Sequence, residues 1–132
     1  MPAITALYAA VIALVLLALG LRISRFRGRT GVGIGDAGDP AFARAIRAHA
    51  NAVEWAVPVL LLMLLAELNR AAPILLHASG IVLVIARILH GIGLSGASGH
   101  SFGRFAGAGL TWLVLVVLAV WNAWAFLRTL AI

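Results

Sequence analysis

The chain has 132 residues, of which 64% are hydrophobic and 11% are charged. So few charged residues cannot cover a soluble domain of this length, and the absence of cysteine excludes disulfides, thiolate metal sites and a cysteine nucleophile. The net charge of +6 comes from ten arginines without any lysine, and most of them flank or enter apolar segments, which argues against nucleic-acid binding.

Four segments are apolar enough to cross a bilayer, which takes about 20 mostly apolar residues. They are residues 3–21, 44–67, 74–94 and 106–127. The first has no basic residue before it and no small-residue cleavage pattern after it, so we interpret it as a retained span rather than a signal peptide. The sequence therefore predicts one all-α domain over residues 1–132, an integral membrane four-helix bundle.

The arginines predict the orientation of the spans, because cytoplasmic loops carry an excess of basic residues. One side of the membrane has only Arg70 and Arg128. The other side has Arg22, Arg25, Arg27, Arg29, Arg44, Arg47 and Arg104. We therefore expect the basic side to be cytoplasmic and both termini to lie outside.

The first span contains one ionisable side chain, Tyr8, and a basic segment follows it. Residues 25–29 fit anchors for lipid phosphates, whereas Arg22 lies nearest the bilayer and is a better candidate for a ligand. Residues 30–39 contain four glycines but follow no strand and precede no Gly-Lys-Ser/Thr, so they predict a turn rather than a phosphate loop.

The second span carries the most informative polar residues. Asp39 and Pro40 predict a helix start, as N-cap and first helical residue, and the helix should run to Asn69. Within it, Arg47, Asn51 and Glu54 stand at i, i+4 and i+7 and share one face. Charged groups in hydrocarbon cost several kcal/mol, about 3 by insertion scales, so these three need protein partners or a ligand.

The third span has Arg87 and His90 near its cytoplasmic end, at a depth that matches Glu54 in the antiparallel second span. We predict that Glu54 and Arg87 form a buried charge pair or share one hydrogen-bond network. The fourth span begins after Arg104, and its Trp121 and Trp124 fit an aromatic belt at the outer interface.

These polar residues gather in the cytoplasmic half and admit two interpretations. Several arginines with one carboxylate and one amide suit a small ligand that has carboxylates and an ammonium group. Alternatively, the groups satisfy one another, with Glu54 and Arg87 fixing the helix packing. His49 and His77 are interpreted as structural residues, and the scattered histidines, without His-x-x-x-His spacing, predict no metal site.

The whole chain resembles the membrane-associated proteins in eicosanoid and glutathione metabolism (the MAPEG family), which include microsomal glutathione transferases. The resemblance rests on the four spans, on residues 47–54 (Arg-Ala-His-Ala-Asn-Ala-Val-Glu) and on residues 86–90 (Ala-Arg-Ile-Leu-His). The chain looks most like the small bacterial branch, which implies an inner-membrane location.

The resemblance implies a homotrimer that binds glutathione between subunits, on the cytoplasmic side. Arg104 would stabilise the glutathione thiolate, because a nearby cation favours that form. The glutathione-binding residues implied by the resemblance are Arg22, Arg47, Asn51, Glu54, Arg87 and His90.

The implied activity is glutathione transfer to, or peroxidase-type reduction of, a lipophilic electrophile. One departure limits it: family enzymes place tyrosines near the thiol, roughly at Leu94 and Ala108 here, and Ser95, Ser98 or Ser101 would have to substitute. The alternatives are a non-catalytic protein of the same fold that binds glutathione or another small ligand, and a small transporter. The clustering of polar groups on one side argues against the transporter.

Overall fold

The computed structural model of the chain describes residues 1–96 and 99–130. Within these ranges the chain forms four helices: α1 (Ala3–Thr30), α2 (Pro40–Leu68), α3 (Pro73–Gly96) and α4 (Phe102–Leu130). Each contains one of the predicted spans and is long and apolar enough to cross a membrane. The predicted all-α class is confirmed, and the chain is an integral membrane protein.

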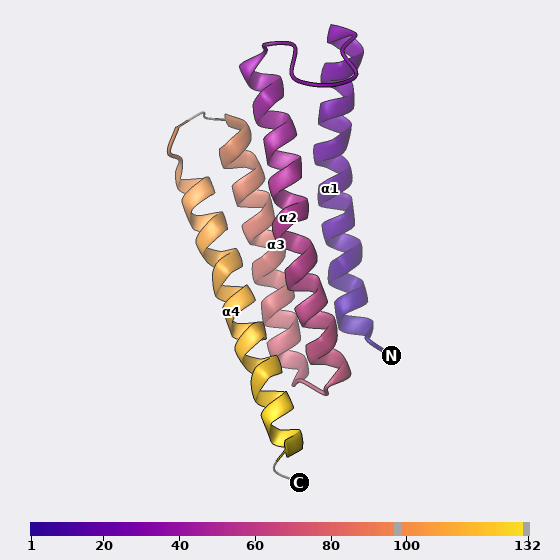
Figure 1. Cartoon of the computed structure of the whole chain (residues 1–132), viewed down its shortest axis with the longest axis vertical. Coiled ribbons are helices and arrows are strands. Elements are labelled where there is room, and N and C mark those ends of the chain that lie inside the picture. Colours follow the sequence, from indigo (N-terminus) through magenta and orange to yellow (C-terminus); the bar gives the residue numbers. More distant parts are fainter. Residues whose placement is uncertain (97–98, 131–132) are drawn as a thin grey trace.

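The helices run alternately up and down, so both termini lie at one end, the terminal end, and the α1–α2 and α3–α4 connections lie at the other, the loop end (Figure 1). α2 and α3 form the middle of the bundle: α1 packs on both of them, and so does α4. Among the described residues α1 and α4 do not contact each other. They are therefore the two open edges of the subunit.

The polar residues at the helix ends explain where α2 begins and ends. The Asp39 carboxylate accepts hydrogen bonds from the backbone N–H groups of Ala41 (2.7 Å) and Phe42 (3.4 Å), which confirms the predicted N-cap. At the other end Arg70 adopts a left-handed conformation (φ 63°), and the N–H of Ala71 bonds to the carbonyl of Ala66 at 2.9 Å. Glycine is the usual residue in that conformation, because it has no Cβ to clash.

Glu67 joins the end of α2 to the start of α1. Its two carboxylate oxygens accept from the backbone N–H groups of Ile4 (2.9 Å) and Thr5 (2.7 Å). The first N–H groups of a helix have no partner within the helix, and an anion there is also favoured by the helix dipole. Glu67 therefore stabilises the N-terminus of α1 at the terminal end.

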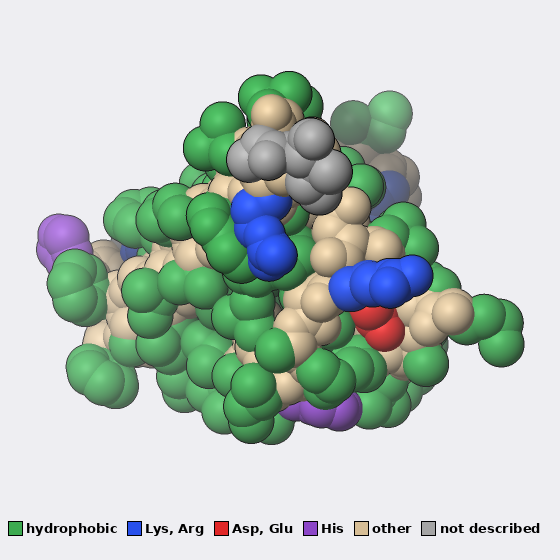
Figure 2. Space-filling view, turned by 90° about the horizontal axis from the view of Figure 1, so that it is seen from below, with side chains coloured by type: hydrophobic (Ala, Val, Ile, Leu, Met, Phe, Trp, Pro, Cys, Tyr) green, Lys and Arg blue, Asp and Glu red, His purple; other side chains and the backbone are tan. Residues whose placement is uncertain are grey.

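Small residues bring the helices close together. On α2 the buried face near the loop end begins with Phe42 and continues with four alanines: Ala45, Ala48, Ala52 and Ala56. Toward the terminal end the core widens into larger side chains such as Val59 and Met63. Seen from the terminal end, hydrophobic side chains cover most of the visible surface, with basic and acidic side chains among them (Figure 2).

The contact between α1 and α3 depends on Gly80. A Cβ atom at Gly80 would lie 2.3 Å from the Tyr8 ring, so no other residue fits without displacing Tyr8. The Tyr8 hydroxyl lies 3.0 Å from His77 Nδ1, within hydrogen-bond distance. This contact gives His77 the structural role that the sequence predicts.

Candidate functional site

Arg87 on α3 is the most deeply buried charged side chain of the described residues, with 2% of its surface exposed. Its guanidinium donates to Asn51 Oδ1 on α2 (3.3 Å), to the Gly107 carbonyl on α4 (3.0 Å) and to the Thr111 hydroxyl. All three acceptors are neutral. Within the described ranges no carboxylate forms an ion pair with Arg87, and its Nε has no hydrogen-bond partner.

The prediction that Glu54 and Arg87 form a charge pair or share one hydrogen-bond network is therefore wrong for the described residues of the single subunit. Glu54 instead forms a two-bonded ion pair with Arg47 on its own helix, with nitrogen–oxygen distances of 3.0 and 3.2 Å. These side chains are 48% and 59% exposed, respectively, on the outer face of α2. Asn51, on the same helical stripe, points further toward the inside of the bundle, and it contacts Arg87 where Glu54 was expected to do so.

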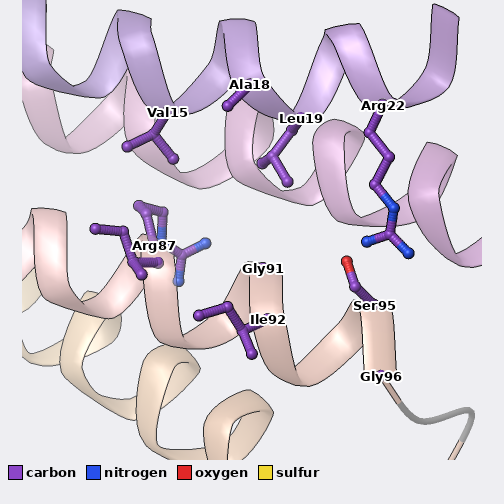
Figure 3. A pocket seen from close by; sticks show the side chains of 10 residues that line it. Val15, Ala18, Leu19, Arg22, Arg87, Gly91, Ile92, Ser95 and Gly96 are labelled. Atoms are coloured by element: carbon purple, nitrogen blue, oxygen red, sulfur yellow. The ribbon is translucent and has the colours of Figure 1, made fainter. Parts of the chain in front are cut away.

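A pocket of about 500 Å³ lies between α1 and α3. Arg87 stands at one end of it, and at the other end Arg22 reaches from α1 toward Ser95 (Figure 3). Apolar side chains separate the two cations; they include Val15, Leu19, Ile88 and Ile92. Among the described residues Arg22 forms no hydrogen bond or ion pair. The pocket thus joins an apolar wall to two cationic groups.

A second pocket, of about 380 Å³, lies between α3 and the start of α4. His90 and Arg104 line it, together with His100, Ser101 and Phe105. Arg104 donates from Nη1 to the Gly99 carbonyl (2.6 Å), and its backbone N–H donates to the Ser101 hydroxyl (3.4 Å). Of the three serines considered as substitutes for tyrosine, Ser101 shares this pocket with Arg104, Ser95 lines the α1–α3 pocket, and Ser98 lies outside the described residues.

The seven predicted site residues therefore lie in three places in the subunit. Arg22 and Arg87 face the α1–α3 pocket, and Asn51 contacts Arg87. His90 and Arg104 line the α3–α4 pocket. Arg47 and Glu54 lie on the outer face of α2. One subunit brings Asn51 and Arg87 together but does not gather the whole set into one site.

Sequence reasoning did not include Gly107 and Thr111, the α4 residues that hold Arg87. Gly103, Gly107 and Thr111 recur every four residues, a pattern of small residues that is typical of close helix packing in membranes. A Cβ at Gly107 would lie 2.6 Å from the Ala86 carbonyl, and one at Gly103 would lie 2.7 Å from that of Leu89. This close approach of α3 and α4 brings the Gly107 carbonyl within reach of Arg87.

His49 lies off the stripe of Arg47, Asn51 and Glu54, as predicted. Its Nε2 lies 3.7 Å from the position that a Cβ on Gly20 would occupy, so it packs against α1. Within the described ranges no group of three or more histidine, aspartate or glutamate side chains could hold a metal ion.

Four membrane-length helices with polar groups buried near one end define a four-helix integral membrane protein with a polar site inside its span. The model of the MAPEG family matches residues 5–124, and the chain belongs to this family. The resemblance predicted from residues 47–54 and 86–90 is thereby confirmed. The chain is 35% identical over 123 residues to the inner membrane protein YecN of Escherichia coli strain K12, covering 92% of this chain and 91% of YecN. YecN of E. coli strain O6:H1 matches with the same identity and coverage.

Proposed function

We propose that this protein binds glutathione within the membrane, at the interfaces between subunits of a homotrimer. The bound thiol would then be transferred to, or reduce, a lipophilic electrophile that arrives through the bilayer. Membership of the MAPEG family supports the ligand, and the name of the relative YecN supports a bacterial inner membrane. The distribution of arginines supports a site on the cytoplasmic side.

The observation that carries this proposal is the buried charge of Arg87. A buried cation is ordinarily neutralised by a carboxylate, and the described residues offer Arg87 only an amide, a hydroxyl and a carbonyl oxygen. These neutral acceptors orient the guanidinium without cancelling its charge. A ligand with a carboxylate supplies the missing negative charge, and glutathione has two carboxylates.

The division of the site into three places supports assembly from several subunits. Arg47 and Glu54 lie on an exposed face of α2, although they belong to an apolar helix of membrane length. Facing lipid, this ion pair would lose its hydration without any further hydrogen bonds to compensate. A neighbouring subunit packed on this face would shield the pair and bring its own α3–α4 pocket, with His90 and Arg104, toward it. The combined site would be complete only in the oligomer.

Each residue then has a role that follows from its chemistry. Arginine guanidinium groups bind carboxylates through two parallel hydrogen bonds, which suits Arg22, Arg47 and Arg87. Glu54 and Asn51 would accept hydrogen bonds from the ammonium group of glutathione. Arg104 would favour the thiolate, whose sulfur attacks the electrophile. In a transfer reaction the new carbon–sulfur bond replaces the bond to the leaving group, which departs with its electron pair.

A non-catalytic binding protein is the second candidate, and the position of the one tyrosine favours it. Tyr8 lies near the start of α1, where it contacts His77, whereas Arg104 lies near the start of α4. The starts of these two helices are at opposite ends of the bundle (Figure 1). Near Arg104 the hydroxyl of Ser101 lies beside the backbone N–H of Arg104, in place of a phenol. A serine hydroxyl is a far weaker acid than a phenol, which has a pKa of about 10, so it is a poorer proton donor to a thiolate or a leaving group.

Glutathione binding to the purified protein, measured by calorimetry, tests the proposal. We expect binding that Arg47→Ala and Glu54→Gln each weaken at least tenfold, whereas Arg25→Gln, a change of an exposed arginine away from all three places, leaves it unchanged. Turnover with a reactive aryl halide and with a lipid hydroperoxide then separates the two candidates. Binding without turnover supports the second candidate, and no binding at millimolar glutathione rejects the proposal that glutathione is the ligand.

A further inference from the structure

The terminal end of the bundle carries a pocket that the proposed glutathione site does not use. Its volume is about 830 Å³, and it lies where the end of α2 meets the last turns of α4. The lining residues that matter for its chemistry are Asn69, Arg70, Trp121, Trp124, Arg128 and Thr129. The two arginines are the only basic side chains on this side of the predicted membrane topology.

Among the described residues, neither arginine forms an ion pair. The one ion pair in this part of the chain is that of Arg47 with Glu54, at the opposite end of α2. Glu67, which lies three residues before Arg70, already accepts two backbone N–H groups of α1. The guanidinium of Arg128 stacks on Trp124, 4.7 Å from the ring centroid, which orients it without neutralising it. The described lining of the pocket thus has two cations and no carboxylate.

An apolar groove continues from this pocket along α4. The groove has a volume of about 510 Å³ and shares Trp121 and Trp124 with the pocket, and its other walls are Leu75, Val116, Val117 and Val120. From Arg128 back to Val116 is twelve residues, about 18 Å along a helix at 1.5 Å per residue. Half of the hydrocarbon core of a bilayer is about 15 Å thick. On α4 the groove itself runs from Val116 to Trp124, eight residues or about 12 Å, and the pocket and groove together are about as long as one leaflet is thick.

We propose that the pocket and groove together bind an anionic phospholipid from the leaflet at the terminal end. Its headgroup phosphate lies between Arg70 and Arg128, and one acyl chain follows the groove past the two tryptophans. Tryptophan is the residue that most often marks this headgroup–hydrocarbon boundary. A second copy of the chain fits less well, because at this depth a copy inserted in the same orientation offers one described carboxylate, Glu67, which already accepts two backbone N–H groups of α1.

The conformation of Arg70 agrees with a ligand role. It occupies the left-handed position that closes α2 (φ 63°), where glycine would be the more stable residue. An arginine there can interact with the negative end of the helix dipole, but that gain is small at an exposed helix end, about 0.3–1 kcal/mol, and is offset by the strain of a positive φ. The same feature provides a useful variant, because Arg70→Gly removes the cation without straining the fold.

Quenching of tryptophan fluorescence by phosphatidylglycerol with brominated acyl chains tests the proposal at the site itself. Trp55 and Trp112 are first replaced by phenylalanine, so that Trp121 and Trp124 report alone. Titration into detergent-purified protein should give saturable quenching. Each arginine near an anionic surface contributes about 1 kcal/mol, so Arg70→Gly and Arg128→Gln should each raise the midpoint about fivefold, and both together about 25-fold. Arg128→Lys should retain most of the binding, and Arg44→Gln, at the loop end, should leave the midpoint unchanged.

Four results would overturn the proposal. Quenching by brominated phosphatidylcholine with the same midpoint would show that the headgroup charge is not recognised. Binding of phosphatidylglycerol to the double variant as tightly as to the wild-type protein would show that the two arginines are not the site. Displacement of the lipid by a low concentration of glycerol phosphate, which has no acyl chain, would identify a site for free anions. Finally, a change of oligomeric state in the double variant with lipid binding retained would make this surface an interface between copies.

Discussion

Replacing Arg87 by methionine tests whether its buried charge serves the fold or a ligand. Methionine fills a similar space with a flexible apolar side chain and removes the three hydrogen bonds to Asn51, Gly107 and Thr111. If the arginine is a structural residue, the fold should depend strongly on it. If the arginine serves to bind a ligand, the fold should tolerate the change, whereas glutathione binding should be weakened.

The expected loss of stability follows from two opposing effects. An arginine at the centre of a membrane helix costs about 2.5–3.5 kcal/mol on insertion scales, and methionine removes that cost. Hydrogen bonds between membrane helices contribute about 0.6 kcal/mol on average and at most about 1.7, so three of them contribute about 2–5 kcal/mol. The difference is small, and we expect Arg87→Met to change the free energy of unfolding by no more than about 2.5 kcal/mol.

A core variant provides the comparison. Leu83 is fully buried, and Leu83→Ala should cost about 2–5 kcal/mol because it leaves a cavity. Unfolding by SDS in mixed micelles, without glutathione, measures both variants, and calorimetry measures glutathione binding. We expect Arg87→Met to be the more stable of the two and to have lost at least tenfold in affinity. An Arg87→Met protein that unfolds more easily than Leu83→Ala, or that binds glutathione normally, would refute the reasoning.

Three further predictions concern other parts of the bundle. Gly80→Ala places a methyl group 2.3 Å from the Tyr8 ring and should destabilise the protein by about 1–3 kcal/mol. In a double-mutant cycle measured by SDS unfolding, Gly80→Ala should cost nothing further once Tyr8 is alanine, and additive losses would contradict the contact. Glu67→Gln removes the anion that receives two N–H groups of α1 and should cost about 1 kcal/mol in the same assay, whereas no change would mean that water replaces the carboxylate at no cost. Arg104→Ala should reduce the ultraviolet absorbance of the thiolate of bound glutathione and slow any conjugation, while Arg104→Lys should retain part of both; an unchanged thiolate signal would remove Arg104 from its proposed role.

Hydropathy and capping residues predict most of the fold, because both are local features that depend only on residues close together in the sequence. The four apolar runs place the helices, and Asp39 followed by Pro40 marks the start of α2. These features require no knowledge of how the helices face one another. The left-handed Arg70 was not predicted, because its position usually holds glycine and nothing in the local sequence distinguishes it from a loop residue.

The partner of Arg87 could not be predicted from depth alone. Matching depths places Glu54 and Arg87 at a similar level, but the direction around the helix axis decides which side chain reaches inward. Asn51 and Glu54 are three residues apart, so they point about 60° apart around α2. That difference turns Asn51 toward Arg87 and leaves Glu54 on the outer face with Arg47. The hydrogen bond from Arg87 to the Gly107 carbonyl depends on how closely α3 and α4 approach each other, and only the packing of the two helices determines that distance.

The bond between Glu67 and the start of α1 has a consequence for biosynthesis. The N–H groups of Ile4 and Thr5 receive their acceptors from a residue 63 and 62 positions later in the chain. While the ribosome is still completing α2, the first helix must leave these groups to water or lipid headgroups. The two helices therefore complete their folding together as a hairpin. In a nascent chain that stops before Glu67, the first N–H groups of α1 still lack these carboxylate acceptors.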